Sequence, residues 1–420
     1  MQRAGICPPL SFKTFQTTPG AIMTTHKRSL SFLLILSALM AFTSLSTDIY
    51  LPAMPTMEKQ LGGNAELTIT GFLTGFAIAQ LIWGPISDRI GRKLPLFIGM
   101  VLFVIGSVGC ALSESMSAVV FWRIFQAVGA CVGPMLSRAM IRDSFAQSQA
   151  AQMLSTLTII MAIAPIAGPF IGGGLLKVAS WHWIFWLLAM IGVLMFTAIF
   201  KLPETLPTEK RASGSVWNAF KNYRTLFTNG TFMRYTLSVT FFYVAAYAFI
   251  TGSPFVYIDY FGVAEQNYGF LFGINIIGIV GLSFLNRKLV SRFALSKLLV
   301  VASLIAFVAS AVLFALVWAN IGGIWGVVAP LFVMFSMNAI IAACANAAAL
   351  AAVPNQIAGS AAALLGSLQY GSGIVSSLLL AAFSSGTPFT MAWIIVLFVG
   401  LSAVMAVWQR VKKPESGEYS

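Results

Sequence analysis

The chain has 420 residues, of which 58% are hydrophobic and only 9% carry a charge. A soluble domain typically has about 25% charged residues, so the composition excludes a water-soluble fold and requires a lipid bilayer as the solvent. The formal net charge of +13 would suit a nucleic-acid partner, but the positions of the charges along the chain argue against one.

Twelve long apolar stretches with at most one charge each divide the chain. Most are close to the ~20 residues that a helix needs to cross a bilayer, whereas the strands of a membrane barrel would be alternating segments of about 10 residues. We therefore expect an all-α integral membrane protein with twelve transmembrane helices in two pseudosymmetric six-helix bundles. The stretches are 30–51, 66–86, 95–113, 117–137, 153–176, 183–200, 235–257, 268–285, 297–318, 324–347, 358–382 and 389–409.

The basic residues follow the positive-inside rule. If the N-terminus is cytoplasmic and the spans alternate, the 25 Lys and Arg residues fall on the cytoplasmic side, except Lys59 and Lys177 outside and Arg123 within a span. Such an asymmetry sets the orientation of a membrane protein. The basic balance therefore reports topology, with both termini cytoplasmic, and we expect no nucleic-acid partner.

Both ends of the chain are polar. Residues 1–22 contain no apolar segment and so are no secretory signal. We expect them to be a disordered extension ahead of a natural start at Met23. Residues 412–420 are expected to form a cytoplasmic tail.

A long hydrophilic interruption separates the first six spans from the last six. We expect a cytoplasmic linker at 203–233 that contains a short interfacial helix. It divides an N-terminal six-helix bundle at 23–202 from a C-terminal one at 234–411. Two halves joined in this way are typical of secondary transporters built from parallel repeats.

Asp48 is the carboxylate that the pattern places within a span, after an uncharged run from Ser29 to Thr47. An ionised carboxylate at membrane depth costs about 2.5–3.5 kcal/mol on insertion scales, which suits a group that loads and releases a proton. The alternative is a carboxylate near the outer interface that ends the helix, helped by Tyr50 and Pro52. Tyr50 is also a candidate for a substrate cavity.

The segment GPISDRIGRK follows the second span. Its first glycine, Gly84, is expected to allow a close approach between helices, and Gly91 to supply a positive φ angle in a short turn. Asp88 is expected to face an arginine or the positive end of a helix and so to latch two elements. The expected cytoplasmic gate comprises Gly84, Asp88, Arg89, Gly91 and Arg92.

Arg123 is the lone base that the pattern places within a span, and such a charge must pair or face water. Gln126 lies one helical turn away. The alternative to a functional role is a structural arginine that binds backbone carbonyls or Glu114.

The fifth span carries APIAGPFIGGG. Its prolines and glycines leave a face with few side chains, which we expect to pack closely against a helix of the other half. Generic packing of small residues is the alternative. The residues of this motif are Pro165, Gly168, Pro169 and Gly172.

The C-terminal half offers aromatic and polar residues within its spans. The segment FFYVAAYAF could form an apolar binding surface with cation–π attraction for positively charged ligands. Each polar residue either lines a cavity or forms a hydrogen bond between helices, and the sequence does not separate the two. The cavity candidates here are Tyr243, Tyr247, Asn275, Asn338, Gln369 and Tyr370.

Three of these segments together identify a family. GPISDRIGRK resembles the signature loop of the major facilitator superfamily, and RIFQAVGA is similar to its arginine-x-x-glutamine-glycine pattern, with Ala127 in place of the glycine. APIAGPFIGGG is similar to the glycine–proline motif of its drug–proton antiporters. STDIYLPAMP, Ser46 to Pro55, resembles the Bcr/CflA group of bacterial drug-resistance transporters.

The resemblance implies a multi-pass drug:proton antiporter of the bacterial inner membrane that works by alternating access. It implies that Asp48 is a proton or substrate site and that Arg123 and Gln126 relay or tune it. Candidate substrates are bicyclomycin-, sulfonamide- or phenicol-type compounds. No second acidic residue precedes Asp48 in the first span, which argues against a two-proton stoichiometry.

Other functions remain open at this point. The chain could export a metabolite such as an amino acid, dipeptide or sugar, with incidental drug export, or it could be a non-transporting sensor or scaffold. It has no G-x-x-x-x-G-K-[ST] segment for ATP. We expect a monomer that is not an enzyme, whose partners are protons, a small amphipathic drug-like substrate and the bilayer, with no cofactor and no metal.

Overall fold

The computed structural model describes residues 19–145, 147–211, 216–354 and 357–411, and these residues form helices and no strand. The first half contains α1 (Pro19–Asp48), η1 (Leu51–Ala53), α2 (Met54–Leu61), α3 (Glu66–Ile90), α4 (Lys93–Ala111), α5 (Met116–Ala130), α6 (Val132–Ser144), α7 (Gln147–Leu175) and α8 (His182–Ile199). The linker contains η2 (Thr208–Lys210) and α9 (Val216–Thr228). The second half contains α10 (Gly230–Pro254), η3 (Phe255–Tyr260), η4 (Glu265–Asn267), α11 (Tyr268–Val290), α12 (Leu295–Trp318), α13 (Gly323–Ala351), α14 (Ala358–Ala382) and α15 (Phe389–Val411).

The fold class predicted from the sequence is confirmed. Within the described residues, eleven helical segments are long and apolar enough to cross a membrane. The helix α7 has 29 residues, and its fully described part, Ala164–Leu175, is apolar. Together with α7 these segments give the twelve spans, with α5 and α6 forming one span that is interrupted at Cys131.

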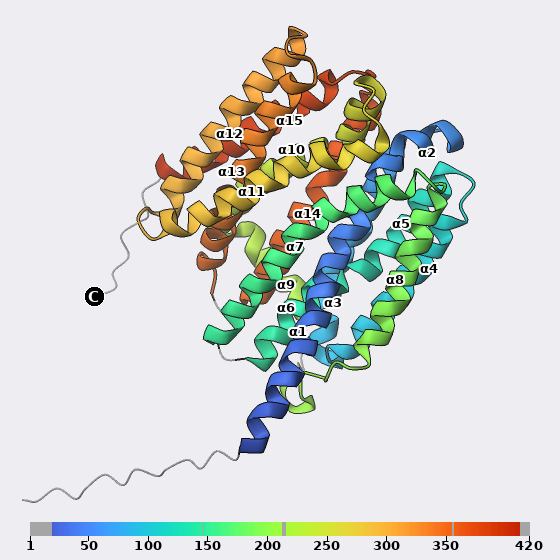
Figure 1. The fold of residues 1–420 in the computed structure, drawn as a ribbon. Coiled ribbons are helices and arrows are strands. Elements are labelled where there is room, and N and C mark those ends of the chain that lie inside the picture. The colour runs from blue at the N-terminus through green and yellow to red at the C-terminus, as the bar shows by residue number, and fades with distance from the viewer. Residues whose placement is uncertain (1–18, 146, 212–215, 355–356, 412–420) are drawn as a thin grey trace, which may run out of the picture.

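The helices form two bundles that meet along two lines. In the first half, α1 packs against α7 and α6, while α4 packs against α5 and α8. In the second half, α10 packs against α15, α14 and α13, and α12 packs against α13 and α15. The halves touch chiefly where α3 lies along α14 and where α7 lies along α11 (Figure 1). Residues far apart in the sequence therefore line one central interface.

The two ends of the molecule differ in charge. The end where α3 turns into α4 carries Arg89, Arg92 and Arg142, and we call it the basic end. The linker helix α9 packs there against α3, α10 and α14. Tyr223 of α9 donates a hydrogen bond to the carbonyl oxygen of Leu81, 3.3 Å away. The linker helix is therefore held against the protein at this end.

Two sequence predictions fall largely outside the described residues. The predicted disordered extension, 1–22, is described only from Pro19 onward, where α1 begins. The predicted tail, 412–420, is not described.

Candidate functional site

A cavity of about 540 Å³ lies between the two halves at the basic end. Phe76 and Tyr370, from opposite halves, are part of its wall, with ring centroids 4.2 Å apart. Its charged residues all come from the first half, whereas α14 contributes only uncharged ones. The charged lining residues are Asp88, Arg89, Arg92, Arg138 and Arg142.

Asp48 is the last residue of α1 and lies in the interior of the bundle, with only 6% of its surface exposed. Its carboxylate forms no ion pair or hydrogen bond with the part of the chain that the structure describes. A charge that is buried without a partner is costly. Binding a proton removes this cost, so the geometry suits a group that alternates between two protonation states.

Arg123 of α5 is fully buried close to the end of α1. Its Nη1 donates to the carbonyl oxygen of Ser46, 3.1 Å away, and to Oε1 of Gln126. The guanidinium carbon lies 4.3 Å from the ring centroid of Tyr50 and 4.2 Å from that of Phe72. Two aromatic faces and two oxygen acceptors therefore hold this cation.

The other nitrogens of the Arg123 guanidinium, Nε and Nη2, have no hydrogen-bond acceptor among the described residues. Asp48 follows Ser46 by two residues but does not form an ion pair with Arg123 in the described structure. Of the structural partners considered for Arg123, a backbone carbonyl, that of Ser46, is present, and Glu114 is not a partner in the described structure. Arg123 thus fixes the α1 backbone two residues before Asp48 and leaves the carboxylate itself free.

Gln126 connects this group to α4. Its Nε2 donates to Oγ of Ser107, 2.7 Å away, and Ser107 donates to the carbonyl oxygen of Phe103 at 2.8 Å. A continuous set of polar contacts therefore runs from α1 through Arg123 and Gln126 to α4.

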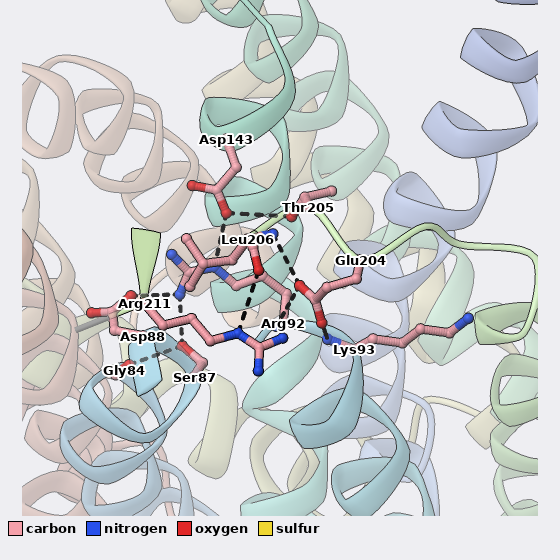
Figure 2. A network of polar contacts seen from close by, with 10 residues as sticks. All are labelled: Gly84, Ser87, Asp88, Arg92, Lys93, Asp143, Glu204, Thr205, Leu206 and Arg211. Carbon is pink, nitrogen blue, oxygen red and sulfur yellow. Dashed lines mark hydrogen bonds and ion pairs between the residues drawn. The ribbon is translucent and has the colours of Figure 1, made fainter. Parts of the chain in front are cut away.

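The loop from α3 to α4 is held by a polar network at the basic end (Figure 2). Arg92 forms ion pairs with Asp88, in the last turn of α3, and with Asp143 of α6, where Nε and Oδ2 are 2.8 Å apart. Glu204 accepts hydrogen bonds from the backbone N–H groups of Arg92 at 2.9 Å and Lys93 at 3.1 Å. Its carboxylate therefore caps the N-terminus of α4 and joins the linker to this loop.

Gly91 has a φ angle of +98°, as the sequence predicts for this turn. A Cβ at this position would also lie 2.6 Å from Oε2 of Glu204. The glycine therefore both permits the turn and makes room for the carboxylate that docks on it.

One detail of the predicted gate differs from the structure, whereas Asp88 faces an arginine as predicted. Gly84 does not mediate a close helix approach, because a Cβ there would meet no atom within 4 Å, and Gly84 instead lines the cavity. Asp88 pairs with Arg92, four residues along the same chain segment, and leaves 53% of its side chain exposed. Neither the Cβ position of Gly84 nor the carboxylate of Asp88 has a partner from the second half in the described structure.

The glycines of α7 divide between the two halves, so the predicted packing against the other half is present only in part. A Cβ on Gly172 would lie 1.7 Å from the carbonyl oxygen of Ile49, and one on Gly168 would lie 3.2 Å from Cβ of Asp48. Only Gly173 contacts the second half, where its Cβ would meet the carbonyl oxygen of Glu265 at 2.6 Å. The motif residues Pro165 and Pro169 lie within α7.

At the end opposite the basic end, the halves are joined directly. Nζ of Lys59 lies 2.8 Å from Oδ1 of Asp259. Thr56 donates a hydrogen bond to Oε1 of Glu265, 2.6 Å away. The halves are therefore in contact at this end, whereas a cavity lies between them at the basic end.

Of the seven predicted cavity residues, Tyr370 lines the cavity in the described structure. Tyr50 is fully buried against Arg123 and shares a hydrogen bond with Thr68, 3.0 Å away. Gln369 donates from α14 to Oδ1 of Asn346 in α13 at 2.7 Å, which is the interhelical alternative. The remaining candidates, Tyr243, Tyr247, Asn275 and Asn338, do not line this cavity.

Sequence reasoning missed Arg138. The fourth span was expected to end at 137, with Arg123 as its only base, but the helix continues as α6 to Ser144. Pro134, Arg138 and Arg142 all line the cavity. Their spacing of four residues places them on one helix face, and this signal could have been found in the sequence. Glu204 and Asp143 were also missed, because their partners lie far away along the chain.

The described residues contain no cluster of three or more His, Cys, Asp or Glu side chains that could hold a metal ion.

A family model, that of the Major Facilitator Superfamily, matches residues 36–377. The chain belongs to the major facilitator superfamily. The superfamily consists of transporters, so the protein is not an enzyme.

Curated relatives cover nearly the whole chain. It is 36% identical over 350 residues to the uncharacterized MFS-type transporter YdgK of Bacillus subtilis, with 82% of this chain and 87% of that protein covered. It is 29% identical over 385 residues to the bicyclomycin resistance protein homolog of Haemophilus influenzae, with 90% and 96% covered. It is 27% identical over 361 residues to multidrug resistance protein D of Escherichia coli, with 84% and 89% covered. These relatives confirm the resemblance to the Bcr/CflA group.

Solved structures show the same fold. A D-xylose–proton symporter aligns with a TM-score of 0.70 at 15% identity, with 90% of this chain and 97% of that chain covered. The nucleoside transporter NupG aligns with a TM-score of 0.71 at 16% identity, with 90% and 99% covered.

Proposed function

We propose that this superfamily member exports small amphipathic, drug-like molecules from the bacterial cytoplasm in exchange for protons. The names of two relatives, a bicyclomycin resistance protein homolog and a multidrug resistance protein, support drug export. The positive-inside distribution supports an orientation in which the basic end faces the cytoplasm, with the protein in the inner membrane and both termini cytoplasmic. Each monomer contains one complete set of the residues proposed to act.

The observation that carries the proposal is the environment of Asp48. It is a buried carboxylate without a hydrogen-bond or ion-pair partner in the described structure, and it lies at the end of α1, where α7 contacts it through Gly168. Asp48 is neutral when it carries a proton, and its buried charge raises the free energy when it does not. It therefore offers a proton a specific place to bind inside the membrane.

The geometry also supports a route from protonation to movement. Asp48 contacts α7, and α7 contacts the second half, where Phe170 packs edge-on against Phe270 of α11 at 4.6 Å. A change in the charge of Asp48 therefore acts on a helix that forms one of the two lines of contact between the halves. The bundles then rock about these contacts, opening the far end as the basic end closes.

The described state fits the loading step of such a cycle. Its cavity lies at the basic end, and Lys59, Asp259, Thr56 and Glu265 hold the other end together. Substrate enters from the cytoplasm in this state. Protonation of Asp48 favours one of the two conformations, which open to opposite sides of the membrane, and substrate binding favours the other.

The test is loss of a pre-formed pH gradient in inverted membrane vesicles on addition of bicyclomycin-, sulfonamide- or phenicol-type compounds. We expect the wild type to dissipate the gradient and Asp48→Asn to bind the compound without proton movement. Glu114→Gln, which changes an exposed carboxylate in the loop before α5, is the control and should behave as the wild type. Equal dissipation by Asp48→Asn would assign the proton to another group. If no compound moves protons in the wild type, the metabolite-export alternative replaces drug export.

A further inference from the structure

We propose that the cavity at the basic end selects substrates that carry a single negative charge on an apolar body, and that Arg138 binds the acidic group. The inference rests on the proposed function and names its substrate class. The aromatic residues of the seventh span suggested a positively charged substrate. The cavity favours instead a substrate that carries a carboxylate or a comparable monoanionic group.

The charge of the cavity wall is the first argument. Four arginines and one carboxylate, Asp88, line it. Arg92 is committed to ion pairs with Asp88 and Asp143. Arg89, Arg138 and Arg142 have no ion pair within the described residues. A concave, largely apolar wall with uncompensated positive charge focuses a potential that attracts anions and repels cations.

The position of Arg138 is the second argument. Along α6 it lies one turn, about 6 Å, deeper than Arg142, and it lines the same cavity as Tyr370 of α14. An arginine offers a planar fork of N–H donors that matches a carboxylate. Arg138 is therefore the cation that a substrate meets when it has passed the mouth of the cavity.

The apolar wall is the third argument. Beyond Arg138 the cavity is lined by the rings of Phe76 and Tyr370, which contact each other at an interplanar angle of 38°, and by Pro134 and Met135. Its volume of about 540 Å³ falls within the range of about 300–1,000 Å³ that is usual for small-molecule sites. An aromatic or aliphatic body packs against these side chains while its acidic group reaches Arg138.

The charge balance gives a consequence that can be measured. If one proton enters on Asp48 for each monoanion that leaves, every cycle moves two positive charges inward. Exchange of one proton for a monovalent cation would move none. Each charge that crosses 100 mV is equivalent to about a fiftyfold concentration ratio, so export of an anion must depend strongly on membrane potential.

The experiment uses three probes of similar shape: 1-naphthaleneacetate, its neutral amide and 1-naphthylethylamine. Binding to the purified full-length protein is measured by calorimetry for the wild type, Arg138→Gln, Arg138→Lys and Arg142→Gln. We expect the carboxylate to bind at least tenfold more tightly than the amine. Arg138→Gln should lower the affinity for the carboxylate at least tenfold and the affinity for the amide less than twofold. Arg138→Lys should recover part of the affinity for the carboxylate. Arg142→Gln should lower the affinity for the carboxylate by a smaller factor than Arg138→Gln does.

Transport of the same probes is measured in proteoliposomes with a potassium diffusion potential and no pH gradient. We expect carboxylate flux out of the compartment that represents the cytoplasm to rise when that compartment is made negative. Tighter binding of the amine, or carboxylate binding that is unchanged in Arg138→Gln, overturns the selectivity. Arg138-dependent carboxylate binding without any proton movement leaves the selectivity standing and refutes the proton exchange, so the two proposals fail separately.

Discussion

Gly168 lies directly against Asp48, since a Cβ on Gly168 would be only 3.2 Å from Cβ of Asp48. One turn further along α7, Gly172 is pressed against the carbonyl oxygen of Ile49. The glycine–proline motif and the buried carboxylate, more than a hundred residues apart in the sequence, are therefore parts of one contact. In the proposed mechanism this contact joins the proton site to a helix that forms one of the two lines of contact between the halves.

The glycines of α7 provide a graded test of that contact. Gly172→Ala should be severe, because its Cβ would lie 1.7 Å from a backbone oxygen and the helices must separate; overpacking of this kind costs about 1–3 kcal/mol or more. Gly168→Ala should be intermediate, since its nearest atom is at 3.1 Å, and Gly174→Ala should be neutral, since no atom lies within 4 Å. Thermal stability in detergent and proton-coupled flux should both follow this order. A flux lost equally in all three variants would contradict the role of the contact.

Replacement of Arg123 should uncouple transport without removing the protein from the membrane. Lysine keeps the charge but cannot lie flat between the rings of Tyr50 and Phe72 while it binds Ser46 and Gln126. Losing a hydrogen bond to a buried charged group costs about 1.5–3 kcal/mol. We expect Arg123→Lys to reduce drug-driven proton flux at least tenfold at normal expression. Wild-type flux in this variant would show that only the charge of Arg123 matters.

The contact between Lys59 and Asp259 should bias the protein toward the described state, but only weakly. The two side chains are 71% and 35% exposed, so the ion pair is worth at most about 1 kcal/mol. Lys59→Ala should therefore shift the population toward opening at that end by no more than about fivefold. Spin-label distances across that end in lipid would report the shift. The double exchange Lys59→Asp with Asp259→Lys should restore the wild-type distances, and failure to do so would assign the effect to lost packing.

Glu204 should make the stability of the basic end depend on pH. Burial alone would raise the pKa of its carboxyl, but the backbone N–H groups of Arg92, Leu206 and Lys93 outweigh this and hold the pKa below its usual value. A lowered pKa in the folded state stabilises the docked loop at neutral pH, and this stabilisation is lost as the pH falls through the folded-state pKa.

Glu204→Gln should accordingly be less stable than the wild type at pH 7, and the difference should shrink as the pH falls below the usual glutamate pKa of about 4.3. Because Glu204 is largely exposed, solvent screening limits the difference to about 1 kcal/mol or less. Thermal unfolding in detergent at several pH values measures it, with Glu209→Gln as the control on the same linker. A difference that does not change with pH would mean that the loss is steric and that the charge of Glu204 has no part in it.

Features that depend on local sequence were predictable. Each span is an apolar stretch, and a bilayer forces such a stretch into a helix because its backbone polar groups find no other partners. The positive φ of Gly91 follows from a tight turn between two spans. The burial of Asp48 and Arg123 follows from their place within uncharged stretches.

Features that depend on which helix faces which were not predictable. The sequence pattern placed the α7 glycines against the second half, whereas Gly168 and Gly172 pack on Asp48 and Ile49, where α1 ends. It made Gly84 a packing residue, although this glycine lines a cavity because the helix ends are apart there. It also gave no partner for Arg92, whose ion pair with Asp143 spans 51 residues.

The sequence by itself determined that the solvent is a lipid bilayer, and it determined the number of spans, the family and the burial of Asp48 and Arg123. Each of these is set by composition or by neighbours along the chain. Only the tertiary structure decided that Arg123 binds the α1 backbone beside Asp48 without pairing with its carboxylate, and that Arg138 is directed to the cavity. The physical reason is that a helix in a bilayer is apolar on nearly every face. Its own sequence therefore does not specify its rotation about its axis, and the packing of twelve helices against one another sets that rotation.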